Sequence, residues 1–176
     1  MIRLECYRIH DDVTLPKIAT LGSACFDVRS YLKNDRGVTV YDMSNKKTER
    51  LPEYYDKEHE PKIRFRIEPG DRVLIPTGII FRIPFGVSMR LHPRSSTSLK
   101  KGLIMPNGEG IIDSDYHHET FIMLYNASAD TVYVGDNERI AQAELVEVEH
   151  CDVWETFEKP EQTTERVGGF GSTGVK

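Results

Sequence analysis

The chain is poor in several features that mark common classes of protein. Among its 176 residues are three cysteines, Cys6, Cys25 and Cys151, with no CxxC pair, too few and too scattered for a disulfide framework. No apolar run reaches the length of about 18 residues that a transmembrane helix requires, and the N-terminus lacks the apolar region of a signal peptide. We therefore expect a soluble protein with reduced thiols, located in the cytoplasm, or in the host cytoplasm if the source is viral.

Positive charge is also scarce. The chain has 23 Lys and Arg against 28 Asp and Glu, a net charge of −5 at pH 7. Gripping a nucleic-acid backbone needs clustered Lys and Arg, so we expect neither a nucleic-acid partner nor a membrane partner. A small anionic ligand is compatible with this balance, because a few local cations decide its binding.

Familiar catalytic motifs are missing. There is no GK[ST] of a Walker A loop, no GxSxG elbow, and no HxE with PCxxC of a zinc deaminase. The adjacent pair His117 and His118 does not indicate a metal site, because neighbours on a strand face opposite sides. Strong amphipathic helices are missing as well.

What the sequence does contain is a series of short β-type runs separated by Gly, Pro, Asn and Asp. The segment Ile63 to Ile67 reads I-R-F-R-I, the alternation of a strand with one wet face. One short helix is expected at Ser95 to Lys101, with Ser and Thr as capping residues and Gly102 at its end. Further strands are predicted at 2–9, 73–75, 78–83, 87–91, 120–125, 131–134 and 140–148. This pattern predicts an all-β sandwich or barrel.

Two segments differ in composition from the rest. Residues 33–62 are charge-dense and poor in core residues, which favours a solvated insertion between strands, with a partner-binding loop as the alternative. Residues 155–176 form a polar tail rich in glycine at its end, which we expect to be mobile when alone. The predicted organisation is a β-domain over 1–154 followed by a C-terminal arm.

Three constellations carry candidate chemistry. Asp113 and Asp115, two apart on a predicted strand, would share a face, where paired acids hold a metal or orient a water, or are simply solvent-facing charges. The glycine-rich run 168–174 offers N–H groups and hydroxyls to phosphates. Phe170 stands in a tail that forms no hydrophobic core, so it suits stacking on a planar ligand. Arg94 followed by Ser95 and Ser96 at a helix start suits a phosphate oxyanion, although such serines are usually only caps.

Taken together and in order, these pieces resemble the trimeric dUTPase family. The resemblance rests on five short motifs spread over almost the whole chain, namely Gly22 to Arg29, Pro93 to Ser96, Asn107 to Tyr116, Glu138 to Gln142, and Arg166 to Gly174. It implies a jelly-roll-like, distorted β-barrel subunit in a homotrimer, with three active sites at subunit interfaces and C-terminal arms exchanged between subunits. The implied activity is Mg²⁺-assisted hydrolysis of dUTP to dUMP and diphosphate by water attacking the α-phosphorus. Such a reaction keeps uracil out of DNA and supplies dUMP for dTMP synthesis.

The resemblance also assigns roles to residues. Asp113 would contact the 3′-hydroxyl and orient the attacking water, and Tyr116 would pack beneath the deoxyribose and exclude UTP. Asp27 would act from the second shell of a Mg²⁺ held mainly by substrate phosphates and waters, with no direct protein ligand. The remaining implied contacts are to uracil by the hairpin with Asn107, Gly110 and Ile112, to the phosphate chain by Arg94, Ser95, Ser96 and Gln142, and to the substrate from a neighbour's tail by Arg166, Phe170, Gly171, Ser172 and Thr173. Of the tail residues, Arg166 would reach the γ-phosphate and Phe170 would cover the uracil.

Two other functions fit the same fold. A double serine at Ser95 and Ser96 also occurs in the related dCTP deaminases, so a dCTP deaminase or a bifunctional deaminase–dUTPase is one alternative. The other is a regulator whose dUTP site gates protein binding through residues 33–62.

Overall fold

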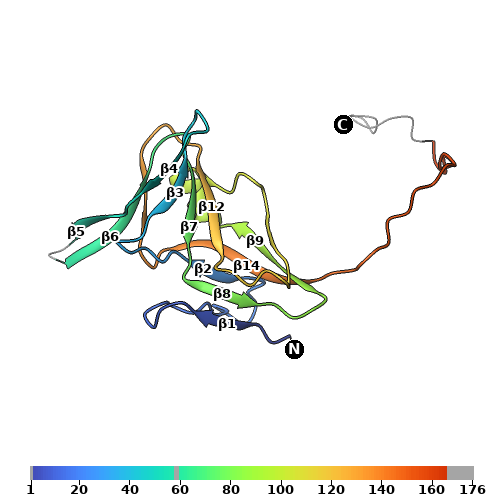
Figure 1. Cartoon of the computed structure of the whole chain (residues 1–176), viewed down its shortest axis with the longest axis horizontal. Coiled ribbons are helices and arrows are strands. Elements are labelled where there is room, and N and C mark those ends of the chain that lie inside the picture. Colours follow the sequence, from blue (N-terminus) through green and yellow to red (C-terminus); the bar gives the residue numbers. More distant parts are fainter. Residues whose placement is uncertain (1, 58–59, 166–176) are drawn as a thin grey trace.

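The structure is a computed structural model that describes residues 2–57 and 60–165. Within these residues the chain forms fourteen strands and one short helix (Figure 1). In chain order they are β1 (Glu5–Arg8), β2 (Phe26–Arg29), β3 (Val38–Tyr41), β4 (Lys47–Arg50), β5 (Glu53–Lys57), β6 (Glu60–Ile67), β7 (Arg72–Pro76), β8 (Ile79–Arg82), β9 (Val87–Pro93), α1 (Ser95–Lys101), β10 (Leu103–Ile104), β11 (Gly110–Ile112), β12 (Phe121–Asn126), β13 (Val132–Gly135) and β14 (Arg139–Glu147).

All strand pairs in the described residues are antiparallel, and neighbours in a sheet are often far apart in sequence. The largest sheet has the order β10-β12-β7-β3-β4 and a second has the order β11-β9-β14-β2. Two smaller sheets, β13-β6-β5 and β1-β8, complete the body. Strands that return to pair with distant partners are typical of a jelly-roll-like β-sandwich, so the predicted all-β class is confirmed.

Alternation along the strands places the core between the sheets. In β6 the side chains of Phe65 and Ile67 are buried while Arg66 between them is exposed, as the I-R-F-R-I pattern predicts. Central strands of both large sheets supply further core residues, including Ile75 of β7 and Leu91 of β9. Burying each such side chain contributes roughly 1.5–3 kcal/mol to folding.

The charged segment 33–62 is more closely integrated than its composition indicates. Its strand β3 pairs with β7 in the largest sheet as well as with β4, and Val38 and Val40 are fully buried. Arg50 of β4 forms an ion pair of 2.6 Å with Asp71, a carboxylate that is only 4% exposed. The segment therefore contributes core residues and a buried ion pair, and only its outer strands are mainly solvated.

Helix α1 occupies the predicted range, but its N-terminus differs from the prediction. The N-cap residue is Arg94, in an extended conformation and without a side-chain capping hydrogen bond, so the predicted Ser and Thr caps are wrong. Gly102 ends the helix with a φ of 63°, a left-handed conformation that favours glycine.

The chain leaves the body after β14. Figure 1 shows this segment extending away from the sheets, and all residues from 149 to 165 are exposed. Trp154 and Phe157 are 84% and 91% exposed there. No helix in residues 2–57 and 60–165 is both long and apolar enough to cross a membrane.

Candidate active site

Residues from three separate motifs meet beside strand β14. The carboxylate of Asp27 on β2 accepts a hydrogen bond of 2.7 Å from Nε of Arg94 and one of 3.1 Å from Nη1 of Arg139. Arg139 and Asp27 are 112 positions apart in the sequence. They meet because β14 lies between β2 and β9, so that Gln142 pairs with Asp27 on one side and with His92 on the other.

A β-bulge shapes this meeting point. The register between β14 and β2 shifts between Arg139 and Ala141, leaving one extra residue on β14. Such a bulge bends the strand and re-aims nearby side chains, and bulges are frequent beside active sites. Here Ile140 stays in the core while Arg139 is half-exposed and reaches Asp27.

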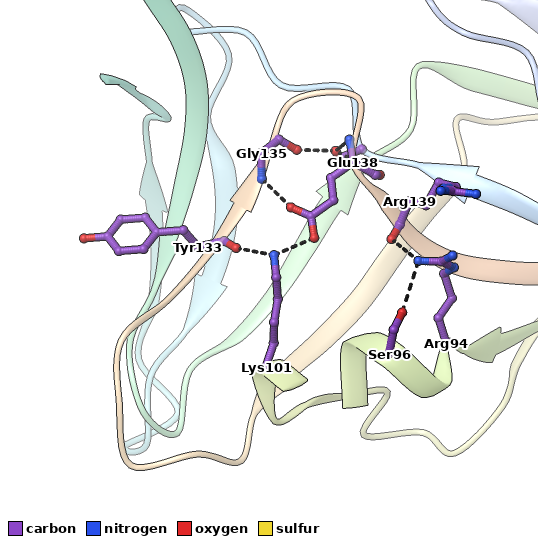
Figure 2. A network of polar contacts seen from close by, with 8 residues as sticks. Arg94, Ser96, Lys101, Tyr133, Gly135, Glu138 and Arg139 are labelled. Atoms are coloured by element: carbon purple, nitrogen blue, oxygen red, sulfur yellow. Dashed lines mark hydrogen bonds and ion pairs between the residues drawn. The ribbon is translucent and has the colours of Figure 1, made fainter. Parts of the chain in front are cut away.

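The start of α1 lies against the same cluster. Nη1 of Arg94 donates to the backbone oxygen of Arg139 at 3.1 Å and lies 3.5 Å from the hydroxyl oxygen of Ser96, as Figure 2 shows. The Gln142 side-chain amide donates to the backbone oxygen of Pro93 at 3.0 Å. Ser95, the first residue of the helix, is exposed. Asp27, Arg94, Ser96 and Gln142 are thus brought together, with Ser95 beside them.

A second polar network ties the end of α1 to the turn that leads into β14 (Figure 2). The Lys101 ammonium donates to the backbone oxygen of Tyr133 at 2.8 Å and forms an ion pair with Glu138. The other carboxylate oxygen of Glu138 accepts from the backbone N–H of Gly135 at 2.9 Å. The helix and β14 therefore hold fixed positions, which fixes the side chains that each presents to the cluster.

Local charge in the cluster is positive. One carboxylate, Asp27, faces two guanidinium groups, and the side chains of Asp27 and Arg94 are each only 23% exposed. A site with an excess cation and limited hydration attracts an anion such as a phosphate. The pKa of the Cys25 thiol, two residues before Asp27, is raised by burial and then by the carboxylates of Glu144 and Asp27.

The other predicted residues lie on a hairpin beside β9. Strand β11 pairs with β9 from Gly110, opposite Leu91, to Ile112, opposite Met89. A Cβ at Gly110 would lie 3.0 Å from Cβ of Leu91, so the close approach of the two strands favours glycine there. Asn107 is exposed at the turn that precedes β11.

The acids of this hairpin are arranged differently from the prediction. Strand β11 ends at Ile112, Asp113 follows it, and Asp115 lies in the next turn. The prediction that Asp113 and Asp115 share one strand face is therefore wrong. The backbone N–H of Tyr116 donates to the oxygen of Asp113 at 3.2 Å, and the Tyr116 hydroxyl donates to the backbone oxygen of Glu119 at 3.0 Å.

Within one chain, Asp113 lies far from the Arg94 cluster, which consists of Asp27, Arg94, Arg139 and Gln142. Ile112 pairs with Met89 near the start of β9, whereas Arg94 follows the end of that strand. The five steps from Met89 to Arg94 span roughly 17 Å at about 3.3 Å per residue. Asp113 and the Arg94 cluster of the same chain therefore cannot act on the same atom of a small ligand. Arg166, Phe170, Gly171, Ser172 and Thr173 lie outside the described residues.

Three residues of this region received no predicted role. Arg139 and Glu138 belong to one of the quoted motifs, and that motif was the available signal for them. Lys101 gave no signal, because its partner Glu138 is distant in sequence. No three His, Cys, Asp or Glu side chains gather as metal ligands in residues 2–57 and 60–165.

Comparison with known proteins identifies the family. The dUTPase family model matches residues 62–174. The deoxyuridine 5′-triphosphate nucleotidohydrolase of Dinoroseobacter shibae is 35% identical over 162 residues, covering 92% of this chain and 88% of that protein. Among solved structures, a mutant of the Staphylococcus bacteriophage 80alpha dUTPase with dUpNHpp has a TM-score of 0.71 at 20% identity, covering 98% of this chain and 99% of that one.

A second phage enzyme shares the fold. The dUTPase of phage phi11 of S. aureus, in which a structural Mg(II) ion is coordinated, has a TM-score of 0.65 at 17% identity, covering 89% of this chain and 97% of that one. The order of the five motifs, the jelly-roll-like body and the relatives agree. The chain belongs to the dUTPase family.

Proposed function

We propose that the protein hydrolyses dUTP to dUMP and diphosphate by attack of water on the α-phosphorus. The observation that carries this proposal is the cluster of Asp27, Arg94 and Gln142, which three family motifs bring to one place from distant parts of the chain. Membership of the dUTPase family supports the same substrate. The three free cysteines fit a reducing compartment, so we assign the reaction to the cytoplasm.

The active unit is proposed to be a homotrimer with a site at each subunit interface. Asp113 and Tyr116 are separated from the Arg94 cluster of their own chain, so a complete site requires the hairpin of a second subunit to face that cluster. The exposed arm supports exchange between subunits, because Trp154 and Phe157 find no cover from the described residues of their own chain. The glycine-rich end of the arm would close over a neighbour's site and exclude bulk water.

The cationic cluster is proposed to hold the phosphate chain. Arg94, oriented by Asp27, presents guanidinium N–H groups to phosphate oxygens, and the hydroxyls of Ser95 and Ser96 add donors beside it. The Gln142 amide donates to Pro93 and fixes the backbone just before Arg94. Neutralising the triphosphate in this way lowers the repulsion that an approaching water oxygen meets.

The site is compatible with a magnesium ion that takes most of its ligands from substrate and solvent. The carboxylate of Asp27 already accepts hydrogen bonds from two arginines, which suits it to an outer-shell contact through water. When bound, Mg²⁺ would withdraw charge from the phosphate oxygens and increase the electrophilic character of phosphorus.

The hairpin is proposed to select the nucleoside and to position the water. Backbone groups between Asn107 and Ile112 would pair with the uracil edge, and a tight hairpin rejects the extra methyl of thymine by contact. Asp113 would accept a hydrogen bond from the water and hold it in line with the α-phosphorus. Tyr116 would pack beneath the deoxyribose, where a 2′-hydroxyl has no room.

The arm is proposed to complete the site from a neighbouring subunit. Phe170 would cover the uracil by stacking, and Arg166 would contact the γ-phosphate. Gly171, Ser172 and Thr173 would supply backbone N–H groups and hydroxyls to phosphate oxygens.

Product analysis tests the reaction. Purified protein with Mg²⁺ is given dUTP, dCTP, dTTP or UTP, beside the variants Asp113→Asn and a truncation before Gly168. We expect conversion of dUTP alone to dUMP and diphosphate, abolished by Asp113→Asn and retained by the exposed control Asp130→Asn. Ammonia from dCTP would instead indicate a deaminase, and bound dUTP without turnover would indicate the regulator.

A mixing experiment tests the shared site. Asp27→Asn and Asp113→Asn subunits are unfolded, mixed in equal amounts and refolded together. If each site takes Asp27 from one subunit and Asp113 from the next, roughly a quarter of the sites in random trimers are intact. Recovery of about that fraction of wild-type activity is expected, whereas no recovery would mean that both residues act within one chain.

A further inference from the structure

We propose that Arg36 and Glu119 are positioning residues that fix the ring of Tyr116 and thereby set the discrimination between deoxyribose and ribose. Neither residue touches the substrate in this proposal, and both act through the Tyr116 hydroxyl. The inference rests on the proposed function, in which the Tyr116 ring packs against the sugar.

The first link is a two-pronged ion pair. Arg36 lies in the turn before β3, and Glu119 lies just before β12. Nη1 of Arg36 donates to Oε1 of Glu119 at 3.1 Å, and Nη2 forms an ion pair with Oε2. Paired contacts between a guanidinium and a carboxylate fix the relative orientation of both groups as well as their distance.

The second link is the anchoring of Glu119 in the body. Its side chain is 9% exposed, and its Oε1 also accepts from the backbone N–H of Gly78 at 2.7 Å. The next residue, Thr120, donates its N–H to the oxygen of Ile79 at 2.9 Å. Its own backbone oxygen accepts from the Thr77 hydroxyl at 2.7 Å. The backbone at Glu119 is therefore held between the turn that joins β7 to β8 and the Arg36 side chain.

The third link reaches the sugar-packing ring. The Tyr116 hydroxyl donates to the backbone oxygen of Glu119 at 3.0 Å. The residue is 37% exposed, so part of its ring remains available for contact with a ligand. The ring of His118 meets that of Tyr116 edge-on at 5.7 Å between centroids. The hydroxyl bond to Glu119 therefore holds one end of the ring, beside the edge contact with His118.

A fixed ring is what steric discrimination requires. An aromatic surface excludes a 2′-hydroxyl only if it cannot tilt away when the larger sugar binds. Because the Arg36–Glu119 pair holds the acceptor of the Tyr116 hydroxyl, loss of the pair should let UTP enter more easily. We expect the preference for dUTP over UTP to fall about fivefold, the effect of losing one ordinary hydrogen bond.

A double-mutant cycle distinguishes this positioning role from a general structural one. The ratio of kcat/KM for dUTP to kcat/KM for UTP is measured for wild type, Arg36→Met, Tyr116→Phe and the double variant. Each single change should lower the ratio about fivefold, and the double variant should fall no further, because both changes break the same connection. An unchanged ratio in Arg36→Met, or effects that add in the double variant, would overturn the proposal.

Removing Arg36 alone leaves a buried carboxylate without its cation, so a second variant protects the fold. Arg36→Met combined with Glu119→Gln replaces the ion pair by neutral groups and keeps an acceptor for the N–H of Gly78. This variant should show the same loss of discrimination. The matched control is Arg66→Met, which removes an exposed arginine on β6 that pairs with Glu68, and it should leave the ratio unchanged.

A spectroscopic measurement separates this inference from the proposed function. The protein is labelled with 3-fluorotyrosine, and the Tyr116 signal is assigned by its disappearance in Tyr116→Phe. Arg36→Met should shift or broaden that signal. An unchanged signal would show that Arg36 does not fix the orientation of Tyr116. If wild-type protein hydrolysed no dUTP, the proposed function would fail, but the fluorine signal would still show whether Arg36 fixes the orientation of Tyr116.

Discussion

Asp27→Asn is the change that most directly tests the cationic cluster. It preserves the size of the side chain but removes the charge that orients Arg94 and Arg139. The amide oxygen still accepts one hydrogen bond, whereas the amide nitrogen faces a guanidinium donor and makes none. Hydrogen bonds to charged groups contribute about 1.5–3 kcal/mol, and the contact that remains still has a guanidinium donor, so most of the loss comes from the one contact that is broken.

The total loss in free energy of unfolding depends on how exposed each arginine partner of Asp27 is. The Arg94 contact is mostly shielded, with both side chains 23% exposed, and keeps its full value. Arg139 is 49% exposed, so its contact is screened by solvent and counts for less. We expect the free energy of unfolding to fall by roughly 1–2 kcal/mol, measured by urea denaturation at one fixed protein concentration.

The effect on catalysis should be larger than the effect on stability. A small misplacement of a positioned group costs about 100-fold in rate, so kcat for dUTP should fall by roughly that factor. The substrate KM should change less, because Arg94 and Arg139 still carry their charges. Steady-state kinetics beside Asp130→Asn provide the test, and a kcat within about threefold of wild type would refute the role assigned to Asp27.

Two further predictions concern stability. Gly78→Ala should cost roughly 2–4 kcal/mol, against about 1 kcal/mol for Gly86→Ala. Both glycines have a left-handed φ, +70° and +78°, but a Cβ at Gly78 would lie 2.6 Å from Val13 whereas one at Gly86 meets nothing within 4 Å. Equal losses in the free energy of unfolding, measured by urea denaturation, would contradict this. The second prediction concerns Asp12, whose pKa is lowered, chiefly by the hydrogen bond from Lys33. The contribution of Asp12 to stability is therefore present above its unfolded pKa of about 3.9 and is lost as pH falls through the lower folded pKa. The difference in free energy of unfolding between wild type and Asp12→Asn, measured by urea denaturation, should therefore shrink below about pH 4.

Elements with a strong local pattern could be predicted from the sequence. The helix bounds Ser95 and Lys101 agree with the structure because Gly102 supplies a clear stop signal. Its N-cap was mispredicted for a reason that local sequence does not contain. Arg94 is held in an extended conformation beside Asp27, and this distant contact makes it the cap residue although serines follow it.

The role of segment 33–62 needed tertiary information. Its charged composition indicates solvation, and Val38 and Val40 are too few to signal a core strand. They become core residues because β3 pairs with β7, a strand that lies well beyond it in the chain. The ion pair between Arg50 and Asp71 depends on the same placement. Long-range pairing of this kind leaves little trace in a single sequence.

For the candidate site, too, the sequence indicates which residues take part but not how they are arranged. Short motifs singled out Asp27, Arg94 and Gln142 as candidates because family resemblance is local in sequence. Their contacts depend on β14 lying between β2 and β9, which no single motif encodes. The separation of Asp113 from this cluster, along the length of β9, could not be read from motif order either. In the proposed trimer, that separation is why a single chain carries all the motifs but supplies only parts of each site, and it makes the mixing of the Asp27→Asn and Asp113→Asn variants the sharpest test of how the parts combine.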